Sequence, residues 1–432
     1  MSDADDLVAR QNARVFYTWS AQKSAVPLEI VDGQGARFTT ADGARWWDLG
    51  SMTWNANLGH GHPRMKEALT KAAARGLLAY PTSAFPDKAR AGELLAEVTP
   101  AGLSKSFICL SGAEANENAV KMARLVTGRK KIVARTRSYH GATLAMLSLS
   151  GDPRREPFEP GLSGIVRIAD PYCFRCPMGK VPSSCHHECA DDLEAALLRE
   201  GPDTVAAVIA EGIVGANGVF VPPPGYWKKL RAICDRHGVL LIADEVLSGF
   251  GRTGKWFAVD HDGVAPDLMT MAKAITGGYA PGGAVIVNER IAKHFDDHVL
   301  VAGLTSYAHP LVCAAIVAAI EALRDEDLVA RAAVAGARLG ARLRALAATR
   351  PAIVDVRGIG LLWALELCEP GTKTPLAAPV LAKLATTLRR HHLHMHKRDN
   401  LVYVAPPLVI GDDEIDEATA ALGRALDEGL TA

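Results

Sequence analysis

The most constraining feature of this chain is a short apolar run that ends in two carboxylates. Residues 239–243 read Val-Leu-Leu-Ile-Ala, and Asp244 and Glu245 follow directly. Consecutive small or branched apolar residues suit a strand that is buried on both faces, as in a parallel sheet. Ligands of open α/β sheets bind outside the carboxyl ends of such strands. The run therefore predicts a buried strand that delivers the Asp244 carboxylate to a binding site.

A lysine takes the same position after a second apolar run. Lys273 directly follows residues 268–272, which read Leu-Met-Thr-Met-Ala. A strand-end lysine and a strand-end aspartate are what pyridoxal 5′-phosphate (PLP) requires. The lysine holds its aldehyde as a Schiff base, and the carboxylate lies beside its pyridine nitrogen. For these two residues alone, a buried Asp–Lys ion pair is the alternative.

The composition limits the class of protein. With 432 residues the chain is too long for one compact core, so two domains are expected. Lys+Arg and Asp+Glu are equal at 48 each, so no global basic field exists for nucleic acid or an anionic membrane. The acidic start lacks the apolar core of a signal peptide, and eight cysteines in so long a chain do not indicate a disulfide scaffold. We expect a cytoplasmic protein with no membrane or nucleic-acid partner.

Strand-like and helical segments alternate between about residues 105 and 290, which favours an α/β fold with a mainly parallel sheet. The clearest expected strands are 106–110, 131–134, 204–210, 239–243 and 268–272. Towards the C-terminus, short strands among helices predict a smaller α+β domain, near 353–356, 361–366 and 401–404. Asp42-Gly43 is typical of a hairpin turn between two further strands. The expected units are an N-terminal arm with part of the small domain, a large domain and a C-terminal small domain, at 1–60, 61–310 and 311–432.

The turn Ser111-Gly112-Ala113 leads from an expected strand into a helix expected at 114–125. The free N–H groups and the positive dipole end of such a helix start can bind an anion. Many helices begin with Ser-Gly, so an ordinary helix cap is the alternative for this turn.

Seven ordered segments resemble the class III aminotransferases, which are PLP enzymes of fold type I. The segments are SGAEANENAVKMAR (111–124), SYHG (138–141), AEGIVGANGVFVPPPGYW (210–227), ADEVLSGFGRTG (243–254), MTMAKAITGGY (269–279), GLTSYAHP (303–310) and APPLVI (405–410). The resemblance spans the chain from about residue 15 to its end. It implies a large domain with a seven-stranded sheet flanked by helices, and a smaller α+β domain built from the arm and the C-terminal part.

The resemblance also implies a role for each matched residue. Lys273 would form the Schiff base and then act as general acid and base, and Asp244 would pair with the pyridine nitrogen. Tyr139 would stack on the ring. The other implied cofactor contacts are the phosphate cup Ser111, Gly112 and Ala113, and the ring neighbours His140, Glu211 and Val246. Thr305 would reach the phosphate in the partner subunit, which implies a homodimer with shared sites; a tetramer stays open.

Arg398 is the leading candidate for the cation that binds the acid group of a substrate, because a guanidinium can bind such a group through two parallel hydrogen bonds. His396 is the competing candidate, and a solvated Arg398 is the alternative. The segment 392–410, together with Leu247 where many family members have Gln, looks most similar to the taurine:pyruvate and ω-amino-acid:pyruvate group. Three aromatic residues are similar in placement to the pocket walls of that group: Trp19, Trp54 and Tyr80.

Two features compete for a metal interpretation. Four cysteines have spacings near those of a zinc site: Cys173, Cys176, Cys185 and Cys189. Because this insert lies outside the PLP motifs, we expect a reduced surface or interface loop without metal, with zinc as the alternative. The second feature is His392, His394 and His396, which alternate as on one strand face. For these we expect an exposed helix-to-strand junction.

We therefore expect a PLP-dependent aminotransferase that moves an amino group from a terminal amine or ω-amino acid, such as taurine or β-alanine, to pyruvate by a ping-pong mechanism. The enzymatic alternatives are a 4-aminobutyrate or diamine transaminase that uses 2-oxoglutarate, and an aminomutase. A zinc-stapled binding protein on a retired PLP scaffold is the alternative from another class. The joint presence of Lys273, Asp244 and Tyr139 argues against it.

Overall fold

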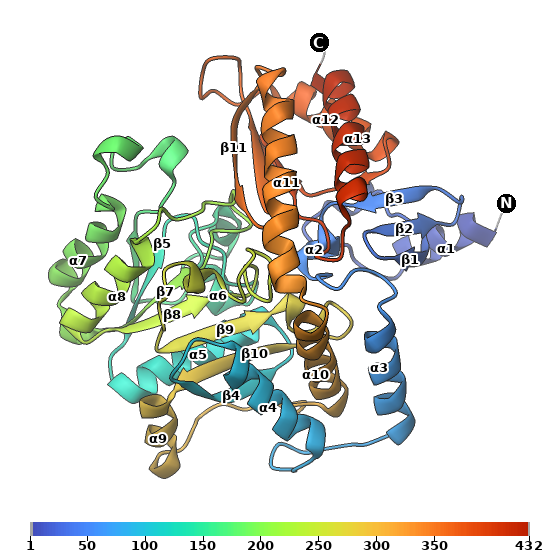
Figure 1. The fold of residues 1–432 in the computed structure, drawn as a ribbon. Helices are drawn as coiled ribbons and strands as arrows, with labels where there is room; N and C mark the ends of the chain where they lie inside the picture. Colours follow the sequence, from blue (N-terminus) through green and yellow to red (C-terminus); the bar gives the residue numbers. More distant parts are fainter. Residues whose placement is uncertain (1–2, 431–432) are drawn as a thin grey trace.

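A seven-stranded sheet with the order β4-β10-β9-β8-β7-β5-β6 forms the centre of the molecule (Figure 1). The computed structural model describes residues 3–430, with side chains from Leu7 onward. β10 is antiparallel to both of its neighbours, and the other adjacent pairs are parallel. The strands are β4 (Leu103–Cys109), β5 (Lys131–Arg135), β6 (Ile165–Ile168), β7 (Val205–Glu211), β8 (Leu240–Asp244), β9 (Leu268–Ala272) and β10 (Gly283–Asn288). The predicted mainly parallel sheet of seven strands is confirmed.

The sheet is covered by helices on both faces, which explains its uninterrupted apolar strands. Every residue of β7, β8 and β9 is buried. Leu241 packs in one core cluster with residues of α7 and α8, whereas Leu240 packs in another with residues of α5. The helices of this part are α5 (Gly112–Thr127), α6 (Leu144–Leu149), α7 (Glu188–Glu200), α8 (Tyr226–His237) and α9 (Glu289–Asp297).

The register of the central strands sets the position of the site. Glu211, at the end of β7, is paired with Asp244, at the end of β8. Asp244 is in turn paired with Thr270 of β9, three residues before Lys273. The two carboxylates and the lysine therefore leave the sheet at the same edge, as the sequence predicted for Asp244 and Lys273.

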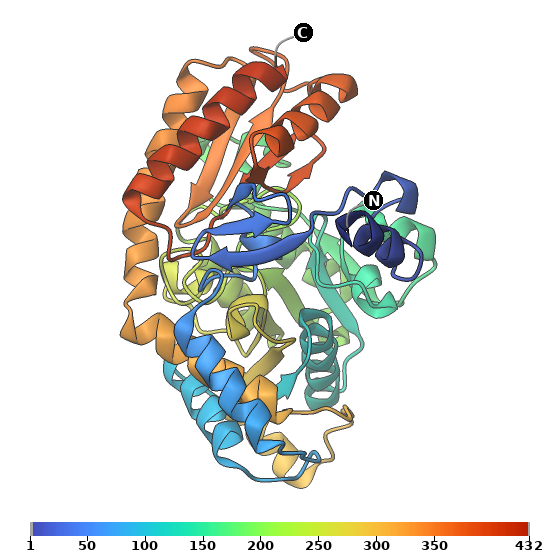
Figure 2. The same ribbon diagram turned by 90° about the vertical axis from the view of Figure 1, so that its right-hand side faces the viewer.

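A second layer of antiparallel strands has the order β11-β12-β15-β14 and is covered by long helices (Figures 1 and 2). Its strands are β11 (Ile353–Ile359), β12 (Leu362–Leu367), β14 (Lys397–Arg398) and β15 (Leu401–Val404). Its helices are α11 (Leu328–Ala348), α12 (Ala378–Arg390) and α13 (Asp412–Leu430). The expected C-terminal α+β part is thus present.

The N-terminal arm joins this C-terminal part through a third sheet, β1-β2-β3-β13. It comprises β1 (Ile30–Gln34), β2 (Arg37–Thr40), β3 (Arg45–Asp48) and β13 (Leu393–His394). β2 and β3 form the hairpin predicted around Asp42-Gly43, and β13 adds to β3 in parallel. The sequence of residues 1–35 suggests an irregular arm with a short helix. The helix is α1 (Asp3–Asn12), but residues 30–34 form β1 because they pair with β2.

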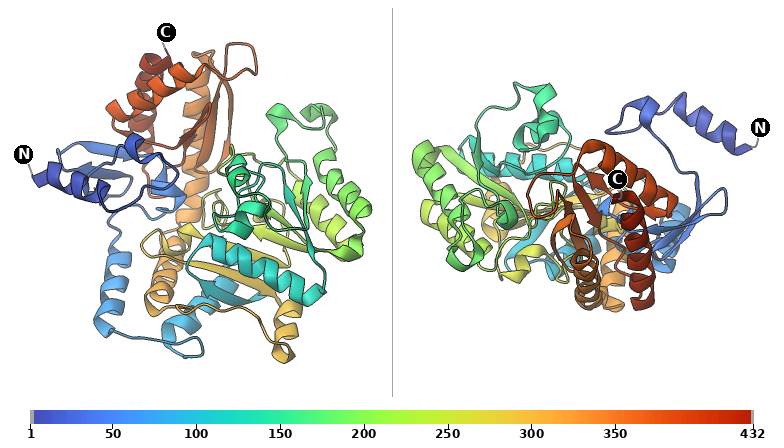
Figure 3. Two further views of the ribbon diagram at one scale, coloured as in Figure 1. Left: turned by 180° about the vertical axis from the view of Figure 1, so that it is seen from behind. Right: turned by 90° about the horizontal axis from the view of Figure 1, so that it is seen from above.

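Three helices extend from the central sheet on the side opposite to α7, and α3 lies beside α10 (Figure 3). These are α3 (Pro63–Arg75), α4 (Pro86–Val98) and α10 (Pro310–Asp325), and α2 (Ser51–Trp54) precedes them. The short 3-10 helices are η1 (Gln22–Ser24), η2 (Pro153–Phe158), η3 (Cys173–Arg175), η4 (Pro182–Ser184), η5 (Pro202–Thr204), η6 (Ala258–His261) and η7 (Lys273–Thr276). Domain boundaries at residues 60 and 310 stay a prediction. Among residues 3–430, no helix has the length and apolar character needed to cross a membrane.

Candidate active site

Asp244 is held at the end of β8 by a complete set of donors. His140 Nδ1 donates to Oδ2 over 2.7 Å, and Asn116 Nδ2 donates to the same oxygen over 2.8 Å. The backbone N–H of Val246 donates to Oδ1 over 3.0 Å. Asp244 and His140 are buried, with 3% and 2% of their surface exposed. A buried carboxylate with these donors has one orientation, which fixes an anion at the strand end.

Glu211 lies beside Asp244 and is also held by backbone donors. Its Oε1 accepts from the N–H of Tyr139 and its Oε2 from the N–H of Gly215, both over 2.9 Å. Burial raises the pKa of Glu211 to about 7, and the nearby Asp244 carboxylate adds to the effect. His140 and Arg135 act in the opposite direction. Glu211 therefore fixes the backbone of Tyr139 and takes up a proton near neutral pH.

Lys273 is the first residue after β9 and has left-handed backbone torsion, with a φ of 50°. For a residue with a side chain, such a conformation costs about 1–3 kcal/mol and is found mainly at functional sites. Burial lowers the pKa of Lys273 to about 8, against the attraction of Asp244 and Glu211. Its Nζ donates to the carbonyl oxygen of Thr53 over 3.4 Å. The side chain is thus an amine that gains and loses a proton near physiological pH.

The start of α5 lies at the same cavity as Asp244 and Lys273. Ser111 is the N-cap residue, and its hydroxyl accepts from the N–H of Glu114 over 3.2 Å. The first N–H groups of a helix have no partner within the helix, so this end can bind a phosphate. A Cβ on Gly112 would come within 2.8 Å of Cγ1 of Val246. Glycine is therefore needed for the backbone to approach Val246 this closely.

These groups open into one cavity of about 780 Å³. Twelve of the fourteen predicted site residues line it: Lys273, Asp244, Tyr139, Ser111, Gly112, Ala113, His140, Glu211, Val246, Trp19, Trp54 and Arg398. An amine with a lowered pKa, a fixed strand-end carboxylate and a helix start converge on this space. The set matches the three ends of PLP: its aldehyde, its ring nitrogen and its phosphate. The residues present therefore fit that cofactor.

Two predicted residues lie outside the cavity of their own chain. Tyr80 is 68% exposed in the loop before α4 and does not line this cavity, so its role as a pocket wall stays a prediction. Thr305 is exposed in the segment before α10. That position is compatible with the role expected for it, which lies in the partner subunit.

Two arginines at the cavity share one buried carboxylate. Arg154 binds Asp152 through Nε and Nη2, over 2.9 and 2.8 Å, and Arg398 Nη1 binds the same carboxylate over 2.7 Å. Arg398 Nη1 also donates to Asn217 Oδ1 over 2.6 Å, so Arg398 is not a solvated side chain. The guanidinium of Arg154 lies 4.2 Å from the centre of the Tyr139 ring. Asp399 Oδ2 also lies 3.8 Å from Arg398 Nε, so this side of the cavity combines two guanidinium groups with two carboxylates.

The sequence did not single out Arg154, Asp152 or Asn116. Asn116 bridges Asp244 and His140, and its Oδ1 accepts from the Thr270 hydroxyl over 2.6 Å. It lies within the segment 111–124, where its place on the buried face of α5 was the available signal. Asp152 caps the short helix η2 and Arg154 lies in its first turn, and only the tertiary fold brings them to Arg398.

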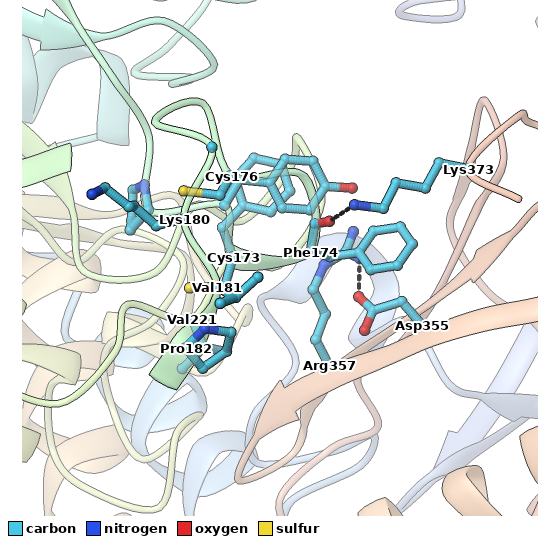
Figure 4. A pocket seen from close by; sticks show the side chains of 14 residues that line it. Cys173, Phe174, Cys176, Lys180, Val181, Pro182, Val221, Asp355, Arg357 and Lys373 are labelled. Atoms are coloured by element: carbon cyan, nitrogen blue, oxygen red, sulfur yellow. Dashed lines mark hydrogen bonds and ion pairs between the residues drawn. The ribbon is translucent and has the colours of Figure 1, made fainter. Parts of the chain in front are cut away.

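The cysteine-containing insert lines a different cavity, of about 600 Å³, which lies against β11 (Figure 4). Cys173 and Cys176 line it from the insert, and Asp355 and Arg357 from β11. The eight cysteines are free thiols. Within the described part of the chain, no three His, Cys, Asp or Glu side chains are grouped so that they could hold a metal ion. The metal-free insert stays a prediction, and zinc binding on addition of the metal stays its alternative.

The histidine segment follows α12, as expected for a helix-to-strand junction, but it is not uniformly exposed. His394 Nδ1 contacts Asp48 Oδ1 over 3.0 Å, and His396 Nε2 contacts the carbonyl oxygen of Met52 over 2.6 Å. Both side chains are partly buried because β13 and β14 bring them against the N-terminal arm. The expectation of an exposed junction holds only for His392.

Comparison with known families decides the class of enzyme. The family model for class III aminotransferases matches residues 18–426, which is nearly the whole chain. This chain is a class III aminotransferase. Enzymes of this family are PLP-dependent, so the predicted family, fold type and cofactor are confirmed, and the assignment of the cofactor to this cavity stays a prediction.

Individual relatives of this aminotransferase support the family assignment. The taurine–pyruvate aminotransferase of Rhodobacter capsulatus is 35% identical, with 98% of this chain and 97% of the relative aligned. A taurine:2-oxoglutarate aminotransferase from Bifidobacterium kashiwanohense, solved in complex with PLP and glutamate, has a TM-score of 0.94 at 35% identity, with 99% of both chains covered. An (S)-enantioselective ω-transaminase from Thermomicrobium roseum has a TM-score of 0.94 at 34% identity and full coverage of both chains.

Proposed function

We propose that this aminotransferase takes the amino group of a terminal amine or ω-amino acid, with taurine and β-alanine as leading donors, and passes it to pyruvate. The observation that carries the proposal is the cavity itself, in which Lys273 and Asp244 face an arginine-lined side. The similarity to taurine and ω-amine enzymes supports the donor class. The enzyme acts in the cytoplasm in this proposal.

Asp244 and Lys273 carry the chemistry in this proposal. PLP, when bound, supplies the electron sink that allows a proton to leave the carbon next to the amine nitrogen. Asp244 would keep the pyridine nitrogen of the cofactor protonated, and Tyr139 would offer a flat face to its ring. The amino group of Lys273 would be the base that accepts this proton and the acid that returns it. Its lowered pKa, about 8, suits both directions of that transfer.

The arginine-lined side of the cavity gives the substrate its orientation. Arg398 is our candidate for the cation that binds the carboxylate or sulfonate group, and Arg154 is a second cation on the same side. Both already contact Asp152, so a substrate anion has to share or replace that contact. The amine end then points away from the arginines, towards Lys273. Trp19 and Trp54 line the same cavity, beside Arg154 and Lys273 respectively.

The same proposal includes a homodimer with shared sites. Three separate segments carry exposed apolar side chains: Phe16 in the N-terminal arm at 87%, Leu78 between α3 and α4 at 86%, and Val299 after α9 at 82%. Contact with a second subunit would cover such side chains. The exposed Thr305 would complete the phosphate site of the partner subunit.

The deciding experiment is a half-reaction without acceptor. Purified enzyme loaded with PLP is mixed with taurine, β-alanine or 1-phenylethylamine, and the visible band of the lysine-bound cofactor is followed. Loss of the band with one donor, and its return on adding pyruvate, is the expected result. Return with 2-oxoglutarate but not with pyruvate would favour the 4-aminobutyrate or diamine alternative. A band that no amine removes would refute the donor class.

A further inference from the structure

The short segment between β3 and α3 has an unusual backbone. Ser51, Met52 and Trp54 have positive φ angles of 43°, 55° and 59°, and Met52 has a ψ of −96°. Three such residues within four positions cost several kcal/mol, at about 1–3 kcal/mol each. The surrounding structure must therefore supply contacts that hold this segment in place.

Asp48 holds the N–H of Met52. Its two carboxylate oxygens lie 2.9 and 3.0 Å from that nitrogen, and the Asp48 side chain is fully buried. His60 and His394 contact the same carboxylate, each over 3.0 Å. Burial acts to raise the pKa of Asp48, but the bonds from His394 and His60 outweigh it and hold that pKa well below its usual range. The acceptor therefore stays ionised.

His396 binds the carbonyl group of Met52. Its Nε2 lies 2.6 Å from the carbonyl oxygen of Met52. A carbonyl oxygen only accepts, so Nε2 carries the hydrogen. Burial lowers the pKa of His396 to about 4, and the charges of His394 and Lys273 act in the same direction. The ring is therefore neutral at physiological pH, and it also packs on Trp54, with ring centres 4.1 Å apart.

The two residues after Met52 enter the active site. The Thr53 carbonyl accepts from Lys273 Nζ, and the Trp54 ring lies 4.9 Å from that nitrogen. Both residues line the cavity. A change in the orientation of the Met52 peptide would therefore move an aromatic wall and a partner of Lys273 together.

We propose that His396 is a positioning residue, which together with Asp48 clamps the peptide groups on either side of Met52 so that Trp54 forms a fixed wall of the substrate cavity. The inference rests on the proposed function and removes His396 as a candidate for binding the acid group of the substrate. Its Nε2 hydrogen is donated to a backbone carbonyl, and its ring packs against Trp54 where both residues line the cavity.

Two substitutions separate the hydrogen bond from the ring. His396→Phe keeps an aromatic ring against Trp54 but removes the donor, and His396→Gln keeps an N–H donor. His391→Phe is the matched control, because His391 contacts Glu428 over 2.8 Å, outside the cavity. The first readout is hydrogen–deuterium exchange of the peptide that contains residues 50–55, in the protein without cofactor. We expect faster exchange in His396→Phe only, with His396→Gln close to the wild type.

The second readout is steady-state kinetics of the loaded enzyme with β-alanine and with 1-phenylethylamine, which lacks an acid group. Loss of one hydrogen bond of about 0.5–1.5 kcal/mol corresponds to a KM increase of about two- to tenfold. We expect this increase for both donors in His396→Phe, little change in kcat, and recovery in His396→Gln. An increase for β-alanine alone would overturn the proposal in favour of acid-group binding, and unchanged exchange would overturn the clamp. If the wild type transaminates neither donor, the proposed function fails, whereas the exchange result still decides the clamp.

Discussion

His140 Nδ1 donates a hydrogen bond of 2.7 Å to Asp244 Oδ2, and both side chains are buried. Asn116 adds a second donor to that oxygen. Asp244 thus has its orientation fixed before any cofactor arrives, which lowers the reorganisation needed when charge develops on a bound ring.

Replacing Asp244 should therefore affect catalysis more than folding. In Asp244→Asn the amide cannot hold a positive charge on the pyridine nitrogen, and we expect kcat to fall at least about 100-fold, as for other preorganised electrostatic groups. PLP should still bind, because Lys273 and the start of α5 are unchanged. Stopped-flow half-reactions measure the effect. Asp203→Asn, at a carboxylate whose side chain is 98% exposed, is the control. Wild-type rates in Asp244→Asn would contradict the role given to this residue.

The amine of Lys273 should titrate far below an ordinary lysine. Its pKa is lowered from 10.5 to about 8 by burial, while Asp244 and Glu211 raise it. In the protein without cofactor, the rate of acetylation of Lys273 should rise through pH 8, measured by mass spectrometry of its peptide. Removing the Asp244 charge takes away a stabiliser of the ammonium form, so Asp244→Asn should shift this midpoint to lower pH. Lys71, 74% exposed, serves as the internal reference. A shift to higher pH would contradict the electrostatic assignment.

The strands around the site were predictable because their sequence is governed by one physical condition. Strands that are buried on both faces, such as 239–243 and 268–272, need apolar residues throughout, and a polar residue marks their end. Asp244 and Lys273 follow from that rule. β1 was not recognised, because three of its five residues are polar or glycine and none is buried.

The arginine-lined side of the cavity depends on long-range contacts that no local sequence pattern predicts. Asp152 and Arg398 are 246 positions apart in the chain, and neither belongs to a periodic segment that would bring them together. The same holds for Met52 and His396, which are 344 positions apart. His396 was considered as a substrate-binding cation because its burial, and with it the loss of its charge, comes from the fold.

Replacing Arg398 or Arg154 should weaken the binding of donors that carry an acid group more than the binding of a donor that lacks one. Arg398→Ala should raise KM for taurine and β-alanine by about tenfold or more, given about 1.5–3 kcal/mol for a hydrogen bond to a charged group. The KM for 1-phenylethylamine should change much less. Arg154→Ala should act in the same direction. Arg155→Ala is the control, because Arg155 pairs with Glu159 and does not line the cavity. Equal effects on all donors would remove either arginine from the acid-binding role.

Close contact at the start of α5 should control the affinity for PLP. A Cβ at Gly112 would come within 2.8 Å of Val246, so Gly112→Ala must displace either the phosphate-facing turn or that side chain. We expect Gly112→Ala to weaken PLP binding by about tenfold, corresponding to about 1.4 kcal/mol. Gly112→Ala combined with Val246→Ala should recover part of the affinity, as measured by titration of the cofactor band. Gly92→Ala, where a Cβ meets no atom within 4 Å, is the control.

A homodimer with shared sites predicts complementation between two defective chains. Thr305→Ala should weaken the phosphate site of the partner subunit, and Lys273→Ala should abolish activity in its own subunit. In a mixed dimer of the two variants, one site combines the intact Lys273 of one chain with the intact Thr305 of the other. That site should bind PLP and react as in the wild type, while the second site carries both defects.

Co-expression with two different affinity tags isolates the mixed species, and its activity should be about half of the wild-type value per dimer. If the site with the intact Lys273 instead behaves like the Thr305→Ala homodimer, Thr305 does not act in the phosphate site of the partner. A chain that is purely monomeric in light scattering would exclude the shared site.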